Sequence, residues 1–317
     1  MDQKINDELL ETINTVLSHQ QQETKKTNRF NRFFKGLIMA YLLFGAYFFT
    51  SYRPSFDTET VTDPHIAVIE IVGEISHDHN TNNSDRISKL LNQVIDNEAT
   101  KAVFLKINSP GGSPVQADQI YREIEYFKAK SGIPVYAFIE DLGASAAYYI
   151  AVSADKIFAD DNSLVGSIGV IGGGFGFTDI MNKVGIERRA YTSGHHKKFL
   201  DPFSPENDVE VLHMNTVLKE THNKFISRVK EGRGDRLKKD ENLFEGLIWS
   251  GKAALKLGLI DGIYSTREFS RMEFGDIPLI NISPSRRFFD GIAKYLGAEF
   301  VKGAIEASVS KTTLELK

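Results

Sequence analysis

The stretch Asp141-Leu-Gly-Ala-Ser-Ala-Ala-Tyr-Tyr-Ile150 follows the short apolar run Pro134 to Glu140 and continues into a helical pattern that ends near Ala154. The residues beside Ser145 are all small, which permits a tight turn from strand to helix and leaves the hydroxyl accessible. Ala147 stands where a nucleophile elbow would have its last glycine. Ser145 is therefore either a candidate nucleophile or a serine in alanine-rich helix packing.

Strand and helix patterns alternate on both sides of this turn. The predicted strands are His65 to Ile75, Lys101 to Ile107, Pro134 to Glu140, Asp155 to Ala159 and Val165 to Ile171. The predicted helices are Ser84 to Asn97, Ser113 to Lys130, Ala144 to Ala154, Pro205 to about Gly232, and a short one between Trp249 and Gly262. This alternation is typical of an α/β domain whose mostly parallel sheet is connected by crossover helices. Ser113 is predicted to cap its helix, with Pro114 at the first helical position.

The composition excludes several classes of function. The 317 residues carry a net charge of -4 and a pI near 6.1, so no overall basic field favours nucleic acid as a partner. The absence of cysteine excludes disulfides, thiolate catalysis and zinc sites built on cysteine. His77, Asp78 and His79 lie in a polar loop and are interpreted as surface residues, so no metal is expected.

An uncharged apolar run extends from Gly36 to Tyr52 and is at the short end of the length that crosses a bilayer. A buried helix would need a polar face, which this run lacks. Five basic residues lie close before the run, namely Lys25, Lys26, Arg29, Arg32 and Lys35, whereas Arg53 is the only one on its other flank before Arg86. The positive-inside rule then predicts a single-pass membrane protein with a cytoplasmic N-terminus and an extracytoplasmic main domain.

The loop Asn108-Ser-Pro-Gly-Gly-Ser113 leads from a predicted strand into the capped helix. Glycines there allow backbone N–H groups to face a ligand, and the helix N-terminus adds positive potential. Such a loop suits an oxyanion hole for a tetrahedral intermediate. An ordinary Pro-Gly-Gly turn is the alternative.

Lys197, in Ser193-Gly-His-His-Lys197, is the candidate base for Ser145, but the residues alone do not separate it from His195, His196 and Lys198 beside it. A base lysine must be neutral, which requires burial in an apolar site. A hydroxyl could hold the neutral amine, and Ser167 is a candidate because it ends an apolar strand beside glycines. The pair predicts a serine hydrolase of the Ser-Lys kind.

These segments together resemble the signal peptide peptidase A family of bacterial membrane-bound Ser-Lys proteases. The resemblance covers about Ile66 to Gly262, and the order and spacing of the segments also fit. Its motifs are Asn108 to Gly112, Gly143 to Ile150, Val165 to Ile171, Ser193 to Lys197 and Gly251 to Asp261.

The resemblance implies a crotonase-like or Clp-protease-like α/β fold and an acyl-enzyme mechanism without cofactor or metal. It implies Ser145 as nucleophile, Lys197 as general base, Ser167 as the residue that orients the lysine, and Gly112 as the oxyanion donor. It further implies a homo-oligomer in which serine and lysine can come from neighbouring protomers. The implied substrates are remnant signal peptides and other membrane-associated peptides, bound as extended strands.

The expected organisation follows from these points. Residues 1–35 are a cytoplasmic segment with an amphipathic helix, 36–52 the transmembrane helix and 53–64 a stalk. Residues 65–285 are the peptidase domain and 286–317 a C-terminal amphipathic helix and tail. The expected location is the bacterial cytoplasmic membrane, with the peptidase domain on the periplasmic or extracytoplasmic side. Gly111, Ala144, Ala146 and Phe175 are predicted to line the substrate groove.

Three other functions remain open at this stage. A Clp-like Ser-His-Asp peptidase would use His195 or His196 as its base. A catalytically inactive membrane scaffold would use its cytoplasmic and C-terminal helices as partner surfaces. A crotonase-like acyl-CoA enzyme would share the glycine-rich oxyanion loop, but its substrate does not suit an extracytoplasmic domain.

Overall fold

The computed structural model describes residues 62–78 and 82–283, and near the N-terminus residues 32, 35–41, 43, 44 and 47. The chain divides into two compact units, Met1–Glu59 and Thr60–Lys317, and each is described by itself. The predicted C-terminal helix over 286–317, nearly all of the stalk and most of the segment 1–35 lie outside the described residues.

In the N-terminal unit, the described residues 35–41, 43, 44 and 47 are helical. Their large apolar side chains are exposed, among them Leu37, Ile38, Met39, Leu43 and Phe44. No helix in the described part of the chain is both long and apolar enough to cross a bilayer. The transmembrane helix over 36–52 therefore stays a prediction.

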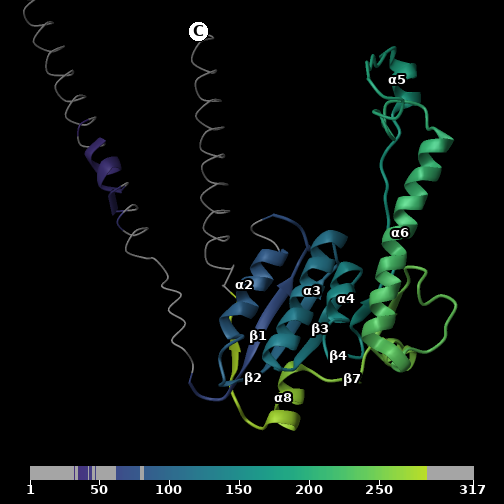
Figure 1. The fold of residues 1–317 in the computed structure, drawn as a ribbon. Coiled ribbons are helices and arrows are strands. Elements are labelled where there is room, and N and C mark those ends of the chain that lie inside the picture. The colour runs from purple at the N-terminus through teal and green to yellow at the C-terminus, as the bar shows by residue number, and fades with distance from the viewer. Residues whose placement is uncertain are drawn as a thin grey trace, which may run out of the picture. The chain divides into compact units, whose positions relative to one another are not determined.

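The second unit is built on one mixed sheet (Figure 1). Its path runs β6-β5-β3-β2-β1-β8, and β4 pairs with both β3 and β7. All pairs are parallel except β5 with β6, so the predicted mostly parallel sheet is confirmed. The strands are β1 (His65–Val72), β2 (Thr100–Ser109), β3 (Val135–Ala144), β4 (Lys156–Ala159), β5 (Leu164–Gly166), β6 (Ile248–Ser250), β7 (Gly262–Ile263) and β8 (Leu279–Asn281).

Helices cover both faces of the sheet, and α2, α3 and α4 lie side by side on one of them (Figure 1). Ser113 caps α3 as predicted, because its side chain accepts a hydrogen bond from the Gln116 N–H, and Pro114 begins the helix. The helices are α2 (Ser84–Val94), α3 (Pro114–Ser131), α4 (Ala146–Ala151), α5 (Thr178–Val184), α6 (Asp208–Arg233), α7 (Gly251–Leu257) and α8 (Thr266–Phe274).

The two faces of the sheet bury different side chains. Along β1, Ala67, Ile69 and Ile71 belong to the larger aliphatic core on the side of α2, α3 and α4. Ile66 and Val68 point to the other face, because successive side chains of a strand alternate. That second core is aromatic and is covered by α8 through Phe269. The α/β class thus follows from strands that are apolar on both faces.

β3 changes partners along its length. On one side Tyr136 to Ile139 pair with β4, and Leu142 to Ala144 then pair with β5. β2 pairs with β3 on the other side, up to Ser109 opposite Gly143. The end of β3 is therefore held between the ends of two other strands, and Ser145 is the next residue.

Several predicted elements are shorter in the structure, and two of them border the serine turn. The strand predicted over Val165 to Ile171 ends at Gly166, because Gly166 (φ 106°) and Ser167 (φ 52°) turn the chain out of extended geometry. The helix predicted from Ala144 begins only at Ala146, because Ser145 is not helical. The short elements α5, β6, β7, β8 and α8 were not part of the prediction.

A projection, here called the arm, comprises residues 171–209 and includes α5. None of its residues is buried. Figure 1 shows that it extends away from the sheet beside α6. Exposed apolar side chains are frequent on it, as at Phe175, Ile180, Val184, Ile186 and Tyr191.

The free energy of unfolding is expected to fall below about pH 4 through Asp261. Burial alone would raise the pKa of this carboxyl, but Arg233 outweighs burial and holds the pKa below its usual 3.8. A depressed carboxyl pKa stabilises the folded chain above the unfolded pKa, and this stabilisation is lost as pH falls through the folded pKa. Urea unfolding of the full chain between pH 3 and 7 measures it. In Asp261→Asn the free energy of unfolding should fall less steeply below about pH 4. An unchanged fall would contradict the assignment of this pH dependence to Asp261.

Candidate active site

Ser145 occupies a strained turn between β3 and α4. Its backbone angles are φ 55° and ψ -125°, in a region that costs a non-glycine residue about 1–3 kcal/mol. Two backbone hydrogen bonds hold it, from the Ser145 N–H to the Gly166 carbonyl at 2.8 Å and from the Tyr149 N–H to the Ser145 carbonyl at 3.0 Å. Strain of this kind at a serine indicates a functional constraint on its position.

The small residues around Ser145 are explained by close packing. A Cβ atom at Gly111 would lie 2.8 Å from the Ser145 Cβ and 2.9 Å from both the Ala144 oxygen and the Ala146 nitrogen. Gly111 also has φ 104°, a conformation that L side chains rarely adopt. Larger residues at Gly111, Ala144 or Ala146 would push the Pro-Gly-Gly loop away from Ser145.

Gly112 presents a free donor beside Ser145. The adjoining residues are tied to Ile75, since the Ile75 N–H donates to the Gly111 carbonyl at 2.9 Å and the Ser113 N–H donates to the Ile75 carbonyl at 2.7 Å. No described residue accepts a hydrogen bond from the Gly112 N–H. Gly112 lines the same cavity as Ser145, so its N–H can bind an oxygen atom of a ligand there.

Ser167 lines this cavity as well. Its N–H donates to the Leu247 carbonyl at 2.7 Å, and its own carbonyl accepts from the Gly169 N–H at 3.0 Å. The next carbonyl, that of Ile168, accepts from the Gly246 N–H and from Nε2 of His222, both at 3.1 Å. Ser167 is therefore held from the β6 side and from α6.

The cavity measures about 960 Å³ and lies between α3, α4, α6 and the chain that follows β5. Small or apolar residues form part of its wall, among them Pro114, Val115, Ala146 and Ile171. Charged residues also border it, namely Asp118, Arg122, Glu220, Lys224 and Glu245.

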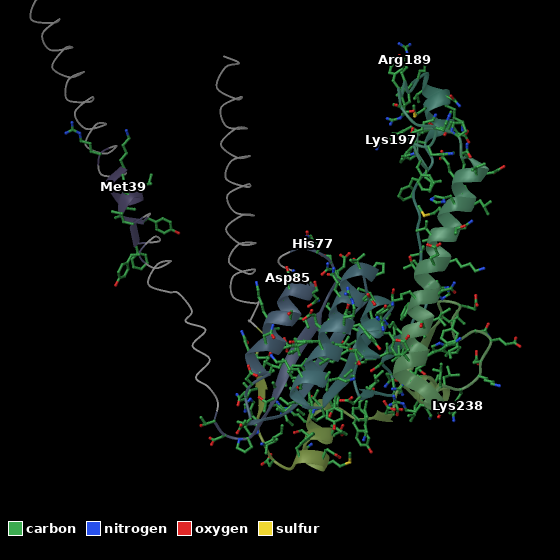
Figure 2. The ribbon with its side chains drawn as sticks, in the orientation of Figure 1. Met39, His77, Asp85, Arg189, Lys197 and Lys238 are labelled. Atoms are coloured by element: carbon green, nitrogen blue, oxygen red, sulfur yellow. The ribbon has the colours of Figure 1, made fainter. Side chains whose placement is uncertain are left out.

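The structure does not bring Lys197 to Ser145 within one protomer. Lys197 is exposed on the arm and does not line the cavity (Figure 2). His195 and His196 are exposed there too, and Nδ1 of His196 lies 3.1 Å from Oε1 of Glu210. Phe175, predicted in the substrate groove, is 82% exposed on the arm and packs near Phe177.

The other predicted groove residues lie at the serine. Ala146 lines the cavity, whereas Ala144 and Gly111 are buried directly behind the turn. Polar cavity residues that the sequence did not indicate include Asp118, Tyr149, His222 and Lys224. Asp118, His222 and Lys224 lie on helices far from Ser145 along the chain, so nothing in their local sequence relates them to the serine.

The second unit is an α/β domain, and the Clp protease family model matches its residues 67–165. The model of peptidase family S49 matches residues 128–272. A candidate protease of Synechocystis sp. (strain PCC 6803) is 30% identical over 213 residues, which cover 67% of this chain and 74% of that protein. The chain belongs to peptidase family S49.

Other relatives match a smaller share of their own length. A Na⁺/H⁺ antiporter NhaA of Brucella abortus is 43% identical over 198 residues, which are 62% of this chain and 27% of that protein. The chain thus spans about a quarter of that relative. A candidate signal peptide peptidase SppA of Enterococcus faecium is 32% identical over 173 residues, 55% of this chain and 50% of that one.

Among solved structures, a mutant of the 1510-N membrane-bound stomatin-specific protease in complex with a substrate peptide aligns with 74% of this chain and 98% of its own. The identity is 18% and the TM-score 0.46.

Proposed function

We propose that this protein is a membrane-anchored serine endopeptidase whose nucleophile is Ser145. The observation that carries the proposal is the strained Ser145 on the same cavity as the unbonded Gly112 N–H. A nucleophile and an oxyanion donor facing one space are two of the parts that acyl transfer needs, and the third is a base. Membership of peptidase family S49 supports the same reaction class.

The mechanism proceeds through an acyl-enzyme. The Ser145 oxygen attacks the scissile carbonyl while a base takes its proton, and the carbonyl oxygen becomes an oxyanion held by the Gly112 N–H. The C–N bond then breaks as the base returns the proton to the leaving amine. Water, deprotonated by the same base, hydrolyses the ester and restores the serine.

The proposed base is Lys197 of a neighbouring protomer, oriented by the Ser167 hydroxyl. Within one chain Lys197 is exposed on the arm, away from the Ser145 cavity. The arm buries none of its residues and exposes several large apolar side chains, which favours a second copy of the chain as its cover. Contact with that copy would desolvate Lys197 and favour its neutral form.

The proposed substrates are remnant signal peptides and other membrane-associated peptides. The name of the Enterococcus faecium relative and the small or apolar residues in the wall of the Ser145 cavity support this choice. Anchoring by residues 36–52 is supported by the apolar run and by the exposed side chains of its described residues. A cytoplasmic N-terminus with the peptidase domain outside is supported by the basic residues that precede the run.

A Ser-His variant of the mechanism is the second candidate, and one observation favours it. His222 lines the Ser145 cavity in the same protomer, whereas His195 and His196 do not. Its Nε2 donates to the Ile168 carbonyl, which leaves Nδ1 as the nitrogen that could take a proton.

Labelling with a serine-directed fluorophosphonate tests the proposed nucleophile. We expect the full chain in detergent to be labelled at Ser145, because only an activated serine reacts with such a probe. Ser145→Ala should abolish the label. Ser227→Ala is the matched control, since it removes an exposed serine of α6 and should keep full labelling. An unlabelled wild-type chain would support the inactive scaffold instead.

A further inference from the structure

Two consecutive tyrosines anchor α4, the helix that follows Ser145. The Tyr148 hydroxyl donates to the Leu259 carbonyl and the Tyr149 hydroxyl donates to Oδ1 of Asp118, each at 2.7 Å. Tyr148 is fully buried and does not border the cavity, whereas Tyr149 forms part of its wall. The two anchors therefore differ in contact with the proposed substrate space, which only Tyr149 borders.

Tyr149 is tied at both of its ends. Its N–H donates to the Ser145 carbonyl, and its hydroxyl is held by Asp118 on α3. Between these ends its ring packs edge-on to Tyr121 at 5.9 Å and lies 5.0 Å from Phe225. Releasing the hydroxyl would free the ring to move at a position one helical turn from Ser145.

Asp118 is itself held firmly by arginines. Arg228 donates to its Oδ1 from Nη2 at 3.3 Å, and Nε of Arg122 lies 3.2 Å from its Oδ2. Arg228 in turn stacks over Tyr121 at 4.3 Å and pairs with Glu231 at 2.9 Å. The carboxylate thus has a fixed position from which to accept the Tyr149 hydroxyl.

The ionisation of both partners keeps this hydrogen bond in place. Burial alone would raise the pKa of Asp118, but the Tyr149 hydroxyl and Arg228 outweigh it and lower the pKa. Burial, together with the Asp118 hydrogen bond, raises the pKa of Tyr149. Around neutral pH the tyrosine is therefore a donor and the carboxylate an acceptor.

We propose that Asp118 is a positioning residue which, through the Tyr149 hydroxyl, sets the wall of the Ser145 cavity and limits the size of the substrate side chain next to the scissile bond. The inference rests on the proposed peptidase function and deepens it. With the ring tethered, the space beside Ala146 and Tyr149 favours a small side chain such as alanine. With the Tyr149 ring released, the same space accepts a larger substrate side chain.

The test uses two fluorogenic peptides that differ only in having alanine or phenylalanine before the scissile bond. The full chain in detergent is assayed, and the readout is the ratio of kcat/KM for the two peptides. Tyr149→Phe and Asp118→Ala should each lower the alanine-to-phenylalanine ratio about tenfold. Their double variant should lower it no further, because both remove the same tether. Asp118→Asn keeps an acceptor oxygen and should retain most of the wild-type ratio.

Tyr148→Phe is the matched control. It removes a hydrogen bond of the same length from the neighbouring residue, so it should lower thermal stability and leave the ratio unchanged. A wild-type ratio in both Tyr149→Phe and Asp118→Ala, or an equal change in Tyr148→Phe, would overturn the inference while the peptidase function stands. A wild-type chain that cleaves neither peptide and reacts with no serine probe would overturn both.

Discussion

Ser145→Ala and Lys197→Ala should each reduce peptide hydrolysis by more than about 10³-fold, because one removes the nucleophile and the other its base. Mixing the two inactive variants should restore activity if Lys197 acts on the serine of a neighbour. A site then works where an intact Ser145 meets an intact Lys197 from another chain, which random mixing provides at about a quarter of the sites. The measurement is hydrolysis of a fluorogenic peptide after the detergent-solubilised variants are dissociated and reassembled together.

His222→Ala and Lys224→Ala provide the controls, since both residues line the Ser145 cavity in the same chain. If Lys197 is the base, these variants keep most of the activity. Full peptide hydrolysis by Lys197→Ala together with an inactive His222→Ala variant would establish the Ser-His mechanism instead. Two inactive variants that regain nothing on mixing, although they assemble together, would place the base in the same chain as the serine.

Arg233→Ala should lower the free energy of unfolding by about 3–5 kcal/mol, which is the usual cost of removing one partner of a buried ion pair. The Arg233 side chain is fully buried and donates to both carboxylate oxygens of Asp261, at 2.8 and 2.9 Å, and to the Gly258 carbonyl. Its removal leaves the Asp261 charge in a largely buried site and opens a cavity at the end of α6. Urea unfolding of the full chain at pH 7, followed by circular dichroism, measures the loss.

Arg236 offers a matched comparison, because it pairs with the same carboxylate at 3.1 Å but its side chain is 42% exposed. Solvent screening limits the contribution of such a pair, so Arg236→Ala should cost about 1 kcal/mol or less. An equal loss of unfolding free energy in Arg233→Ala and Arg236→Ala would mean that burial does not determine how much each arginine contributes through Asp261.

The order of the main strands and helices could be predicted, because their signals are local. Apolar runs such as Lys101 to Ile107 indicate strands by themselves, and Ser113 with Pro114 marks the start of a helix. The boundaries around Ser145 and Val165 to Ile171 could not be predicted. They depend on the positive φ angles of Ser145, Gly166 and Ser167, which the paired ends of β3 and β5 impose.

The residues of the candidate site also fall into those that the sequence indicates and those that it does not. Ser145, Gly112 and Ser167 could be found because each follows a strand and lies among small residues. The cavity residues on α6 and the Asp118–Tyr149 hydrogen bond could not, because α3, α4 and α6 meet only in the folded chain. Phe175 was predicted in the groove, but the structure places it on the arm, where it is exposed.

The sequence by itself determined the α/β class, the serine turn and the glycine loop, since each depends on neighbours along the chain. The resemblance of its motifs proposed Lys197 as the candidate base. Only the tertiary structure decided that the serine turn, the Gly112 N–H and Ser167 share one cavity and that Lys197 lies outside it. The reason is physical: backbone preferences act over a few residues, whereas the position of an exposed arm depends on what packs against it. For Lys197 that packing partner is, in our proposal, a second copy of the chain.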